Sequence, residues 1–472
     1  MQAHGTVNGK PALFRTEEHA FTWREEDNDY SPTNGVDVER SISTENIITV
    51  LASELGHTLF YTRQQEDQDN STGRTSASSL ASIATAGLPQ AVIDQYQPHA
   101  NSQWLAPASE SKTEHHVVVS TGSGTGTAVV VWEKLVQPLL DRLVSSDPDY
   151  HDDYYEVFKT TSEASVAELT QNVLLPKANE GVAQSILLLS GDGGIVDIVN
   201  SLLAGERSAA YVKPTISLLP LGTGNALANS SGITGDKTLG LRAMLQGTPK
   251  ALPLFRAKFS PGANLLVDEG RREEPLHSVI EGCPVAHGAV VCSWGHHAGL
   301  VADSDTTEYR KHGSQRFQMA AKEALFPSDG SPPHAYKGHV CVRRPGRDEC
   351  EDVPRSEHGY ILVTFVGQLE AGFTISPDSR PLDGKLRLVH FGALSGQEAM
   401  DVMTKAFQGG KHVDEASVGY EEIEGLKIEF DEDDARWRRL CIDGKIIRVE
   451  KGGWVEVDTK VDSVVDLVCR TK

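Results

Sequence analysis

The sequence lacks the marks of secreted, membrane-spanning and nucleic-acid-binding proteins. Its six cysteines form no CxxC pair and no regular framework, so we expect free thiols in a reducing compartment. No segment approaches the ~20 apolar residues that span a bilayer, and the start, MQAHGTVNGKPALF, has no basic flank followed by an apolar stretch. A formal charge of -22 leaves little basic surface for a phosphate backbone. These absences predict a cytoplasmic protein that binds no nucleic acid and contacts membranes only peripherally and reversibly.

The chain also lacks an internal repeat of fixed period, and its 472 residues suffice for two or three domains of about 150 residues each. Residues 1–112 contain a few strand-like pieces and the polar tract RQQEDQDNSTGRTSASS, which begins at Arg63. A tract of this composition is typical of a solvated loop or disorder. We therefore expect residues 1–112 to be an N-terminal extension that is partly disordered, and they give no chemical signal.

Residues 113–250 repeat one local pattern three times. HHVVVSTGSGTGTA, SILLLSGDGG and TISLLPLGTGN each place a β-branched or leucine-rich run before a glycine loop, and apolar residues at helical spacing follow. Strands that alternate with helices indicate a parallel sheet covered on both faces. The three glycine loops would then open at the carboxyl ends of the strands, where α/β folds bind ligands.

After residue 250 the alternation stops. Short runs such as ILVTFV, LRLVHF, LKIEF and KIIRVE are separated by glycine, proline and acidic turns, which predicts an antiparallel β-rich domain over residues 251–472. One helical insertion, at about residues 396–407, interrupts it. The expected fold class is therefore α/β, with a parallel-sheet domain followed by a β-rich domain.

The glycine loops match neither of two common phosphate-binding patterns. GxxxxGK[ST] is absent, and GSGTGTA lacks the spacing of a dinucleotide fingerprint. A single loop is most simply a tight strand-to-helix turn, but three in consecutive units favour phosphate binding by backbone N–H groups. Asp192, in the second loop, is on this evidence either a turn residue or a carboxylate for chemistry.

Five segments in the same order resemble the catalytic region of the diacylglycerol kinase and sphingosine kinase superfamily. LLLSGDGGIVDIVNSLL and ISLLPLGTGNALANS match a GDG loop and a P-x-GTGN-x-LA loop. SWGHHAGLVADSDTTEYRKHGSQRF is closer to the sphingoid-base kinase branch, and ISPDSRPLDGKLRLVHF and RRLCIDGKIIRVE match P-x-DG-x-L and DGE stretches. The resemblance runs from about Val117 to Val457. It implies a phosphofructokinase-like α/β domain that binds ATP and a β-rich antiparallel sandwich domain that binds lipid.

The resemblance implies an ATP- and Mg²⁺-dependent kinase that phosphorylates the primary hydroxyl of a sphingoid long-chain base. Asp192 matches the general base that takes the proton from the lipid hydroxyl. Arg310 and Arg316 match arginines that hold ATP phosphates. The residues that match the nucleotide loops are Ser123, Gly124, Gly126, Gly191, Gly193, Gly222, Thr223, Gly224 and Asn225.

Four further aspartates are assigned in the same way. Asp305 matches the residue that pairs with the ammonium group of the base, and Asp303 is its nearest competitor. Asp383 matches a magnesium position and Asp443 a nucleotide position, although both are equally plausible as turn aspartates before glycine. For the two arginines, the alternative is a surface ion pair with Asp303, Asp305 or Glu308. His296 and His297 have no cysteine or carboxylate at ligand spacing, so packed or exposed histidines are expected there rather than a metal site.

The sequence departs from the family pattern at several positions. In this sequence Ser120 and Thr121 replace the Asn-Pro of the first loop, Gly194 follows GDG, and Lys445 replaces the glutamate of DGE. Near Asn200, Asp197 and Ser201 stand where glutamate and glycine are usual. These changes favour weaker ATP binding or altered metal geometry. Two alternatives therefore stay open, a kinase for diacylglycerol or ceramide and a non-catalytic protein that binds lipid or nucleotide.

Overall fold

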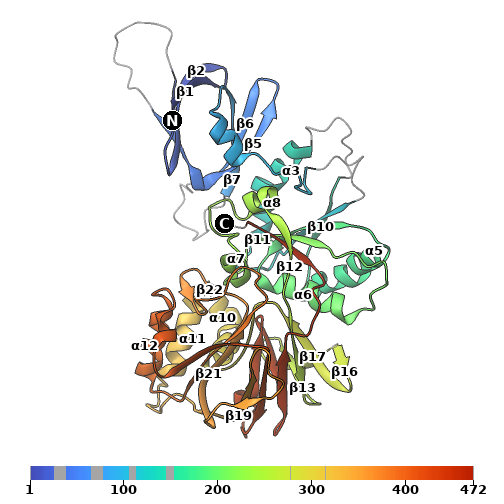
Figure 1. Cartoon of the computed structure of the whole chain (residues 1–472), viewed down its shortest axis with the longest axis vertical. Helices are drawn as coiled ribbons and strands as arrows, with labels where there is room; N and C mark the ends of the chain where they lie inside the picture. Colours follow the sequence, from blue (N-terminus) through green and yellow to red (C-terminus); the bar gives the residue numbers. More distant parts are fainter. Residues whose placement is uncertain are drawn as a thin grey trace.

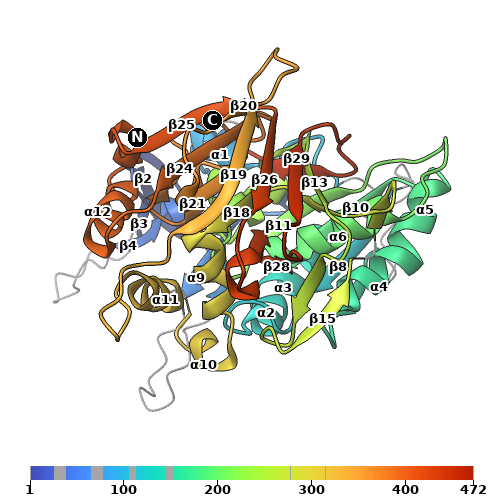
Figure 2. The same cartoon turned by 90° about the horizontal axis from the view of Figure 1, so that it is seen from below.

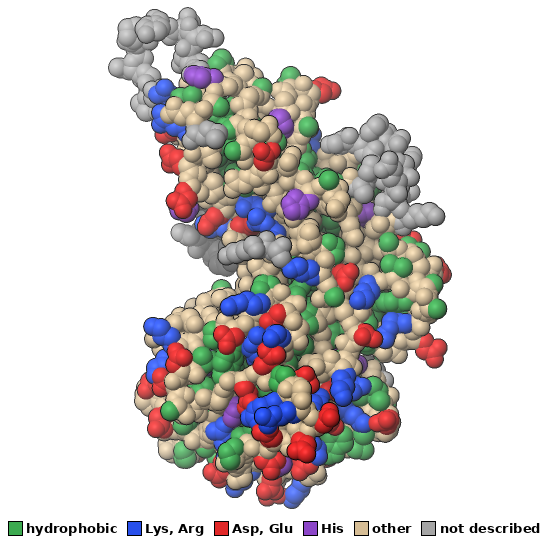
Figure 3. All heavy atoms as spheres, in the orientation of Figure 1, with side chains coloured by type: hydrophobic (Ala, Val, Ile, Leu, Met, Phe, Trp, Pro, Cys, Tyr) green, Lys and Arg blue, Asp and Glu red, His purple; other side chains and the backbone are tan. Residues whose placement is uncertain are grey.

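The computed structural model describes residues 2–25, 39–64, 78–105, 113–144, 154–276, 278–313 and 315–470. Figure 1 shows three bodies stacked along the long axis of the molecule: an N-terminal sheet, a central α/β body and a β-rich body. In Figure 3 the acidic side chains on the visible face of the β-rich body are interspersed with Lys and Arg. No helix in the described ranges is both long and apolar enough to cross a membrane.

The N-terminal body is a seven-stranded antiparallel sheet in the order β4-β3-β2-β1-β7-β6-β5. Its elements are β1 (Gln2–Val7), β2 (Lys10–Thr16), β3 (Ala20–Glu25), β4 (Arg40–Ser43), β5 (Ile47–Ser53), β6 (Gly56–Gln64), β7 (Ser78–Ala86) and α1 (Gln90–Tyr96). Asn8 and Gly9, both at positive φ, make the two-residue turn between β1 and β2. In the core of this body Phe14 stacks on Phe21, and the ring of Trp23 packs against Phe21 at a tilt. This ordered sheet corrects the expectation of a partly disordered extension with only a few strand-like pieces, and residues 65–77 of the polar tract lie outside the described ranges.

The central body has the predicted parallel sheet, in the order β12-β30-β11-β10-β8-β9. Its strands are β8 (Glu114–Val119), β9 (Glu156–Lys159), β10 (Gln184–Ser190), β11 (Thr215–Pro220), β12 (Thr248–Ala251) and β30 (Asp466–Cys469), and β12 alone among them is antiparallel to its neighbour. Its helices are α2 (Ala128–Val131), α3 (Gln137–Val144), α4 (Ser165–Leu169), α5 (Leu175–Asn179), α6 (Asp192–Ala204), α7 (Ala226–Ser230) and α8 (Leu241–Gln246), with π-helical turns Trp132–Val136 and Thr170–Leu174. Alternate residues of β10 enter different core clusters, Leu188 with α6 and Leu189 with α3. Both faces of the sheet are thus covered, as predicted.

The β-rich body is a curled sheet of fifteen strands, as the short apolar runs predicted. Its strands are β13 (Phe255–Phe259), β14 (Asn264–Val267), β15 (Arg272–Pro275), β16 (Ser278–Ile280), β17 (Cys283–Gly288), β18 (Val291–Gly295), β19 (Tyr336–Arg343), β20 (Glu351–Asp352), β21 (Glu357–Thr364), β24 (Leu386–Gly392), β25 (Val418–Ile423), β26 (Gly425–Phe430), β27 (Arg439–Ile442), β28 (Lys445–Arg448) and β29 (Trp454–Asp458). A separate hairpin pairs β22 (Gln368–Glu370) with β23 (Phe373–Thr374). Four helices, α9 (His296–Ser304), α10 (Thr307–Arg310), α11 (Gln315–Leu325) and α12 (Gly396–Ala406), belong to this body. Figure 2 shows α9, α11 and α12 along one side of the sheet.

Two features differ from the expectations. The last strand, β30, leaves the β-rich region and pairs in parallel with β11 of the central sheet, so the predicted 251–472 unit includes a strand of the other body. The expectation of six free thiols is wrong for two of them, because Cys341 and Cys350 form a disulfide. It closes the β19–β20 hairpin, whose strands pair antiparallel. The other four cysteines are free.

Candidate active site

Three glycine loops meet at the carboxyl edge of the central sheet: the first loop (residues 120–126), the second (190–194) and the third (221–225). A Cβ on Gly191 would lie 2.8 Å from Cα of Gly222, and one on Gly124 would lie 2.3 Å from the carbonyl oxygen of Leu221. The Gly191 N–H also donates to Ser123 Oγ at 3.1 Å. The loops therefore pack directly on one another, and glycine is required because any side chain would separate them.

The third loop is held in one conformation by Asn225. This residue adopts the left-handed region with φ of 52°. Its Oδ1 accepts from the Gly222 N–H at 2.9 Å, and its Nδ2 donates to the Gly222 carbonyl oxygen at 2.9 Å. Thr223 and Gly224 complete this loop, so all nine predicted loop residues lie in the three adjoining loops. A Cβ on Gly193 would meet no atom within 4 Å, which leaves open space beside the second loop.

Asp192 begins α6 and points its carboxylate at the start of α7. Oδ2 accepts from the Ala226 N–H at 2.7 Å and Oδ1 from the Leu227 N–H at 3.1 Å. Burial raises the pKa of Asp192 to about 6, although these two hydrogen bonds lower it. The carboxylate thus fixes the third loop to the second, a structural role that the sequence analysis missed. Each oxygen keeps an unused acceptor lone pair, and the raised pKa is suited to proton transfer near neutral pH.

Asp443 lies close to Asp192, in the turn between β27 and β28. Its φ is 47°, and its carboxylate accepts from the backbone N–H groups of Ala289, Val290 and Val291. Burial raises its pKa to about 7, and the charge of Asp192 also raises it. Asp443 is therefore a turn aspartate that fastens β27 to β18, and it brings a second carboxylate of raised pKa to the second loop.

Two of the residues that depart from the family pattern contact each other. Lys445 Nζ lies 3.1 Å from Asp197 Oδ1, which joins β28 to α6. One turn further along α6, Asn200 exchanges two hydrogen bonds of 2.9 Å with the backbone of His287 on β17. The β-rich body is thereby attached to the same helix that begins at Asp192.

Gly194 and the first loop also have structural explanations. A Cβ on Gly194 would lie 2.6 Å from Oγ of the buried Ser190, so a larger residue does not fit beside this serine. Thr121 of the first loop exchanges hydrogen bonds of 2.9 Å with Thr160, which follows β9. These departures therefore accompany local packing that accommodates them.

Asp305, Arg310 and Arg316 form one ion-pair cluster. Arg310 donates to both oxygens of Asp305 at 3.0 and 2.9 Å, and Arg316 donates to Oδ1 at 3.0 Å. Although burial opposes the shift, the hydrogen bonds and charges of both arginines hold the pKa of Asp305 below its usual value. This is the ion-pair alternative that the sequence left open, and the phosphate and ammonium roles of the three residues stay predictions.

Asp303 and Asp383 are engaged by other arginines. Asp303 pairs with Arg436 and Arg439 at 2.9 Å each, which the sequence analysis did not foresee because these residues are far apart in the chain. Asp383 accepts from Arg387 Nη1 at 3.1 Å and from two backbone N–H groups of its turn. With these donors on its carboxylate, Asp383 does not fit a Mg²⁺ ligand, which needs its oxygens for the ion. Within the described ranges no three His, Cys, Asp or Glu side chains are grouped so as to hold a metal ion.

The two adjacent histidines on α9 are packing residues. His296 contacts the ring of Tyr336 edge-on, and His297 Nδ1 lies 2.7 Å from Ser293 Oγ. Burial lowers the pKa of both to about 4. Both imidazoles are therefore neutral near pH 7.

Known proteins resemble this arrangement. Residues 114–257 match the family model of the diacylglycerol kinase catalytic domain. Sphingosine kinase 1 of Caenorhabditis elegans is 34% identical over 113 residues, which are 24% of this chain and 21% of that protein. Sphingosine kinase 1 of Mus musculus is 23% identical over 322 residues, which are 63% of this chain and 77% of that protein. A crystal structure of a diacylglycerol kinase from Bacillus anthracis aligns with 76% of this chain and 97% of its own, at 13% identity and a TM-score of 0.44.

The matched segment contains all three glycine loops and Asp192, whereas the aligned part of the nematode protein is only about a fifth of its length. Residues 114–257 thus match the diacylglycerol kinase catalytic domain, and the chain is similar to proteins named sphingosine kinase over part of its length.

Proposed function

We propose that this protein is an ATP-dependent lipid kinase that phosphorylates the primary hydroxyl of a sphingoid long-chain base. The observation that carries the proposal is that Asp192, whose pKa burial raises to about 6, lies where three glycine loops meet. A carboxylate with this pKa is mostly ionised at pH 7 and still accepts a proton readily. The similarity to proteins named sphingosine kinase supports a sphingoid base as the substrate class.

In the proposed reaction, Asp192 accepts the proton of the lipid hydroxyl as the hydroxyl oxygen attacks the γ-phosphorus of ATP. The bond from that phosphorus to the β–γ bridging oxygen breaks, and ADP leaves. The loop N–H groups would hold the phosphates, since the Cβ position of Gly193 is open to solvent. Mg²⁺, when bound, would supply positive charge to the phosphates. Peripheral membrane contact and a cytoplasmic location are parts of the proposal that follow from the lipid substrate.

Label transfer from γ-labelled ATP to sphingosine and to diacylglycerol tests the proposal. We expect the wild-type protein to label sphingosine and the Asp192→Asn variant to lose roughly 100- to 10,000-fold of that rate, because the general base is gone. Asp329→Asn, a substitution of an exposed turn aspartate on the β-rich body, is the control and should keep full activity. A wild-type protein that labels neither lipid refutes the proposal.

A kinase for neutral lipid is the second candidate, and one observation favours it. Both oxygens of Asp305 are already bonded to Arg310 and Arg316, so its charge is compensated without an ammonium group. The variant Asp305→Ala separates the candidates. It should lower kcat/KM for sphingosine at least about tenfold if Asp305 binds the amine, and leave transfer to diacylglycerol nearly unchanged. Asp303→Ala, which removes a carboxylate paired with two other arginines, tests the competing assignment, because it should lower kcat/KM for sphingosine instead if Asp303 binds the amine.

A further inference from the structure

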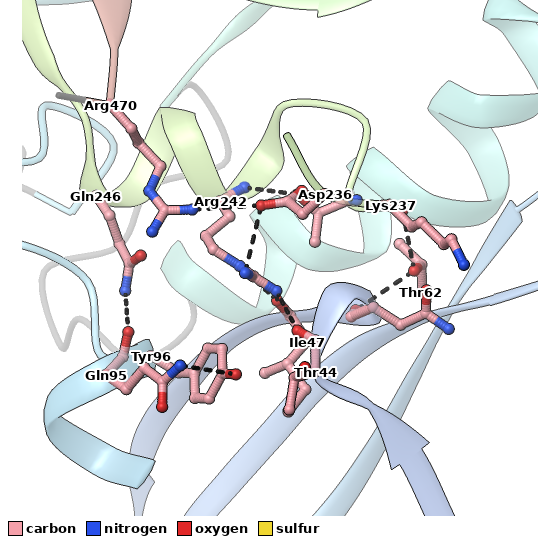
Figure 4. Close-up of polar contacts among 12 residues, drawn as sticks. Thr44, Ile47, Thr62, Gln95, Tyr96, Asp236, Lys237, Arg242, Gln246 and Arg470 are labelled. Atoms are coloured by element: carbon pink, nitrogen blue, oxygen red, sulfur yellow. Dashed lines mark hydrogen bonds and ion pairs between the residues drawn. The ribbon is translucent and has the colours of Figure 1, made fainter. Parts of the chain in front are cut away.

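A buried arginine joins the N-terminal sheet to the central body. Arg242, on α8, donates from Nε to the carbonyl oxygen of Ile47 at 2.8 Å and from Nη2 to that of Thr44 at 2.6 Å (Figure 4). Its guanidinium carbon lies 5.1 Å from the centre of the Tyr96 ring. The side chain thus takes backbone oxygens of the N-terminal sheet as partners, although it belongs to the catalytic domain segment.

Asp236 balances the charge of this arginine inside the interface. Its Oδ2 lies 3.3 Å from Arg242 and 3.4 Å from Arg470, which follows β30. Its Oδ1 accepts from the backbone N–H of Thr238 at 3.0 Å and from the Thr238 hydroxyl at 2.5 Å. The side chains of Arg242 and Asp236 are only 9% and 8% exposed. A charge so deeply buried holds its partner tightly, because losing the partner would leave it uncompensated.

The N-terminal sheet also bonds the backbone between these two residues. The Lys237 N–H donates to the carbonyl oxygen of Glu45 at 3.0 Å, and its own carbonyl oxygen accepts from Thr62 Oγ1 at 3.2 Å. Both backbone groups of one loop residue are therefore satisfied by the other body. The position of the 231–240 segment is fixed from outside the catalytic domain.

The same segment reaches the third glycine loop through two side chains. Thr234 Oγ1 donates to Asn229 Oδ1 at 2.9 Å, and Asn229 Nδ2 donates to the Gly224 carbonyl oxygen at 2.9 Å. Thr234 lies two residues before Asp236. A path of polar contacts, completed by the backbone between Thr234 and Asp236, thus runs from the N-terminal sheet through Arg242 and Asp236 to the loop that would contact nucleotide.

We propose that the N-terminal sheet positions the third glycine loop, and that Arg242 is a positioning residue for nucleotide binding. A binding loop keeps its geometry only when the groups behind it are themselves fixed by packing and hydrogen bonds. Here those groups are fixed by a different body of the same chain. The proposal rests on the proposed function for the identity of the ligand, but the positioning of the loop itself does not depend on that ligand.

Three variants of the full-length chain test the proposal. Arg242→Gln removes the buried charge, and Thr234→Val removes one exposed hydrogen bond from the chain of contacts without disturbing the core. Gln246→Ala is the matched control, because Gln246 lies on the same helix and its side chain donates to the carbonyl oxygens of Gln95 and Gln97 in the N-terminal region, at 2.9 and 3.0 Å, rather than to the 231–240 segment. Hydrogen exchange of peptides covering residues 221–231 reports the loop, and calorimetric titration with ATP reports binding.

We expect hydrogen exchange in residues 221–231 to be about tenfold faster in Arg242→Gln and about threefold faster in Thr234→Val than in wild type. The dissociation constants for ATP should rise by similar factors, and Gln246→Ala should stay close to wild type in both measurements. Unchanged exchange in Thr234→Val and in folded Arg242→Gln overturns the inference, and so does an equal effect of Gln246→Ala. If Arg242→Gln does not fold, Thr234→Val decides. If wild-type protein binds no ATP but exchange responds as expected, the positioning stands and the proposed function fails.

Discussion

The burial of Asp192 should appear as a pH dependence of stability that Asp192→Asn removes. The folded-state pKa of Asp192 is raised from 3.8 to about 6, so the folded protein binds this proton more tightly than the unfolded chain does. The stability that protonated Asp192 contributes is present in full below its unfolded pKa and is lost as pH rises through the folded pKa. Asparagine does not ionise, and the variant should not show this loss.

The magnitude follows from the shift. A rise of roughly two pKa units corresponds to about 3 kcal/mol at about 1.4 kcal/mol per unit, and because the side chain is partly exposed we expect about 2–3 kcal/mol. The free energy of unfolding of Asp192→Asn minus that of wild type should therefore increase by this amount between about pH 4 and about pH 6.5. The charge of Asp192 also raises the pKa of Asp443, so its removal should extend the gain slightly toward pH 7. The amide loses one acceptor for the Ala226 and Leu227 N–H groups, but that cost does not vary with pH.

Urea unfolding followed by tryptophan fluorescence, in a series of buffers across this range, measures the difference. Buried histidines that must protonate in acid, such as His287 and His297, destabilise both proteins alike and cancel. Asp329→Asn is a control of opposite sign, because hydrogen bonds from Ser331 lower the pKa of Asp329. Curves for Asp192→Asn and wild type that stay parallel over the whole range would refute the burial argument and, with it, the reason for assigning Asp192 a pKa suited to catalysis.

Two further predictions concern the residues that depart from the family pattern. Gly194→Thr should destabilise the protein by about 1–3 kcal/mol in thermal unfolding, because its Cβ would lie 2.6 Å from Ser190 Oγ. Gly193→Ala, which has open space at its Cβ, should be tolerated, and equal destabilisation by the two substitutions would contradict the packing argument. Lys445→Glu should lower the free energy of unfolding in urea by about 1 kcal/mol, because it breaks the half-exposed ion pair with Asp197. Adding Asp197→Lys should restore most of this stability, whereas additive losses in the double variant would show that the pair contributes nothing.

The sequence predicted best what local pattern controls. The alternation of strand, glycine loop and helix over residues 113–250 led to the parallel sheet, and the short apolar runs led to the β-rich body. Gly191 and Gly222 were expected at the nucleotide loops, although their close approach to each other, the stronger reason for glycine there, needs the tertiary structure. The GDG and GTGN motifs lie within residues 114–257, which match the family model of the diacylglycerol kinase catalytic domain, whereas the other three motifs lie outside that match.

What the sequence could not predict depends on contacts between distant segments. β30 pairs with β11 across about half the chain, and a short apolar run at the end of a β-rich region carries no sign of which sheet it joins. The Cys341–Cys350 disulfide requires two strands to meet, and its nine-residue separation is not the CxxC spacing by which a pair can be found in sequence. The N-terminal sheet was obscured because its strands are separated by polar segments.

Asp192 shows that a structural role in the turn and a chemical role do not exclude each other in the GDG loop. Its carboxylate receives the first two N–H groups of α7, so it closes the second loop onto the third, and this closure buries it and raises its pKa. A residue used only as a turn would stay solvated and keep an ordinary pKa, whereas one used only as a base would not fix the neighbouring loop. Burial raises this pKa more than the two hydrogen bonds from α7 lower it, so a substitution that loosens α7 and admits water to Asp192 should lower the pKa of Asp192 together with the order of the loop. Measuring the pH dependence of lipid phosphorylation in Thr234→Val would test this coupling: the acidic limb should move to lower pH, and an unmoved limb would separate the two roles.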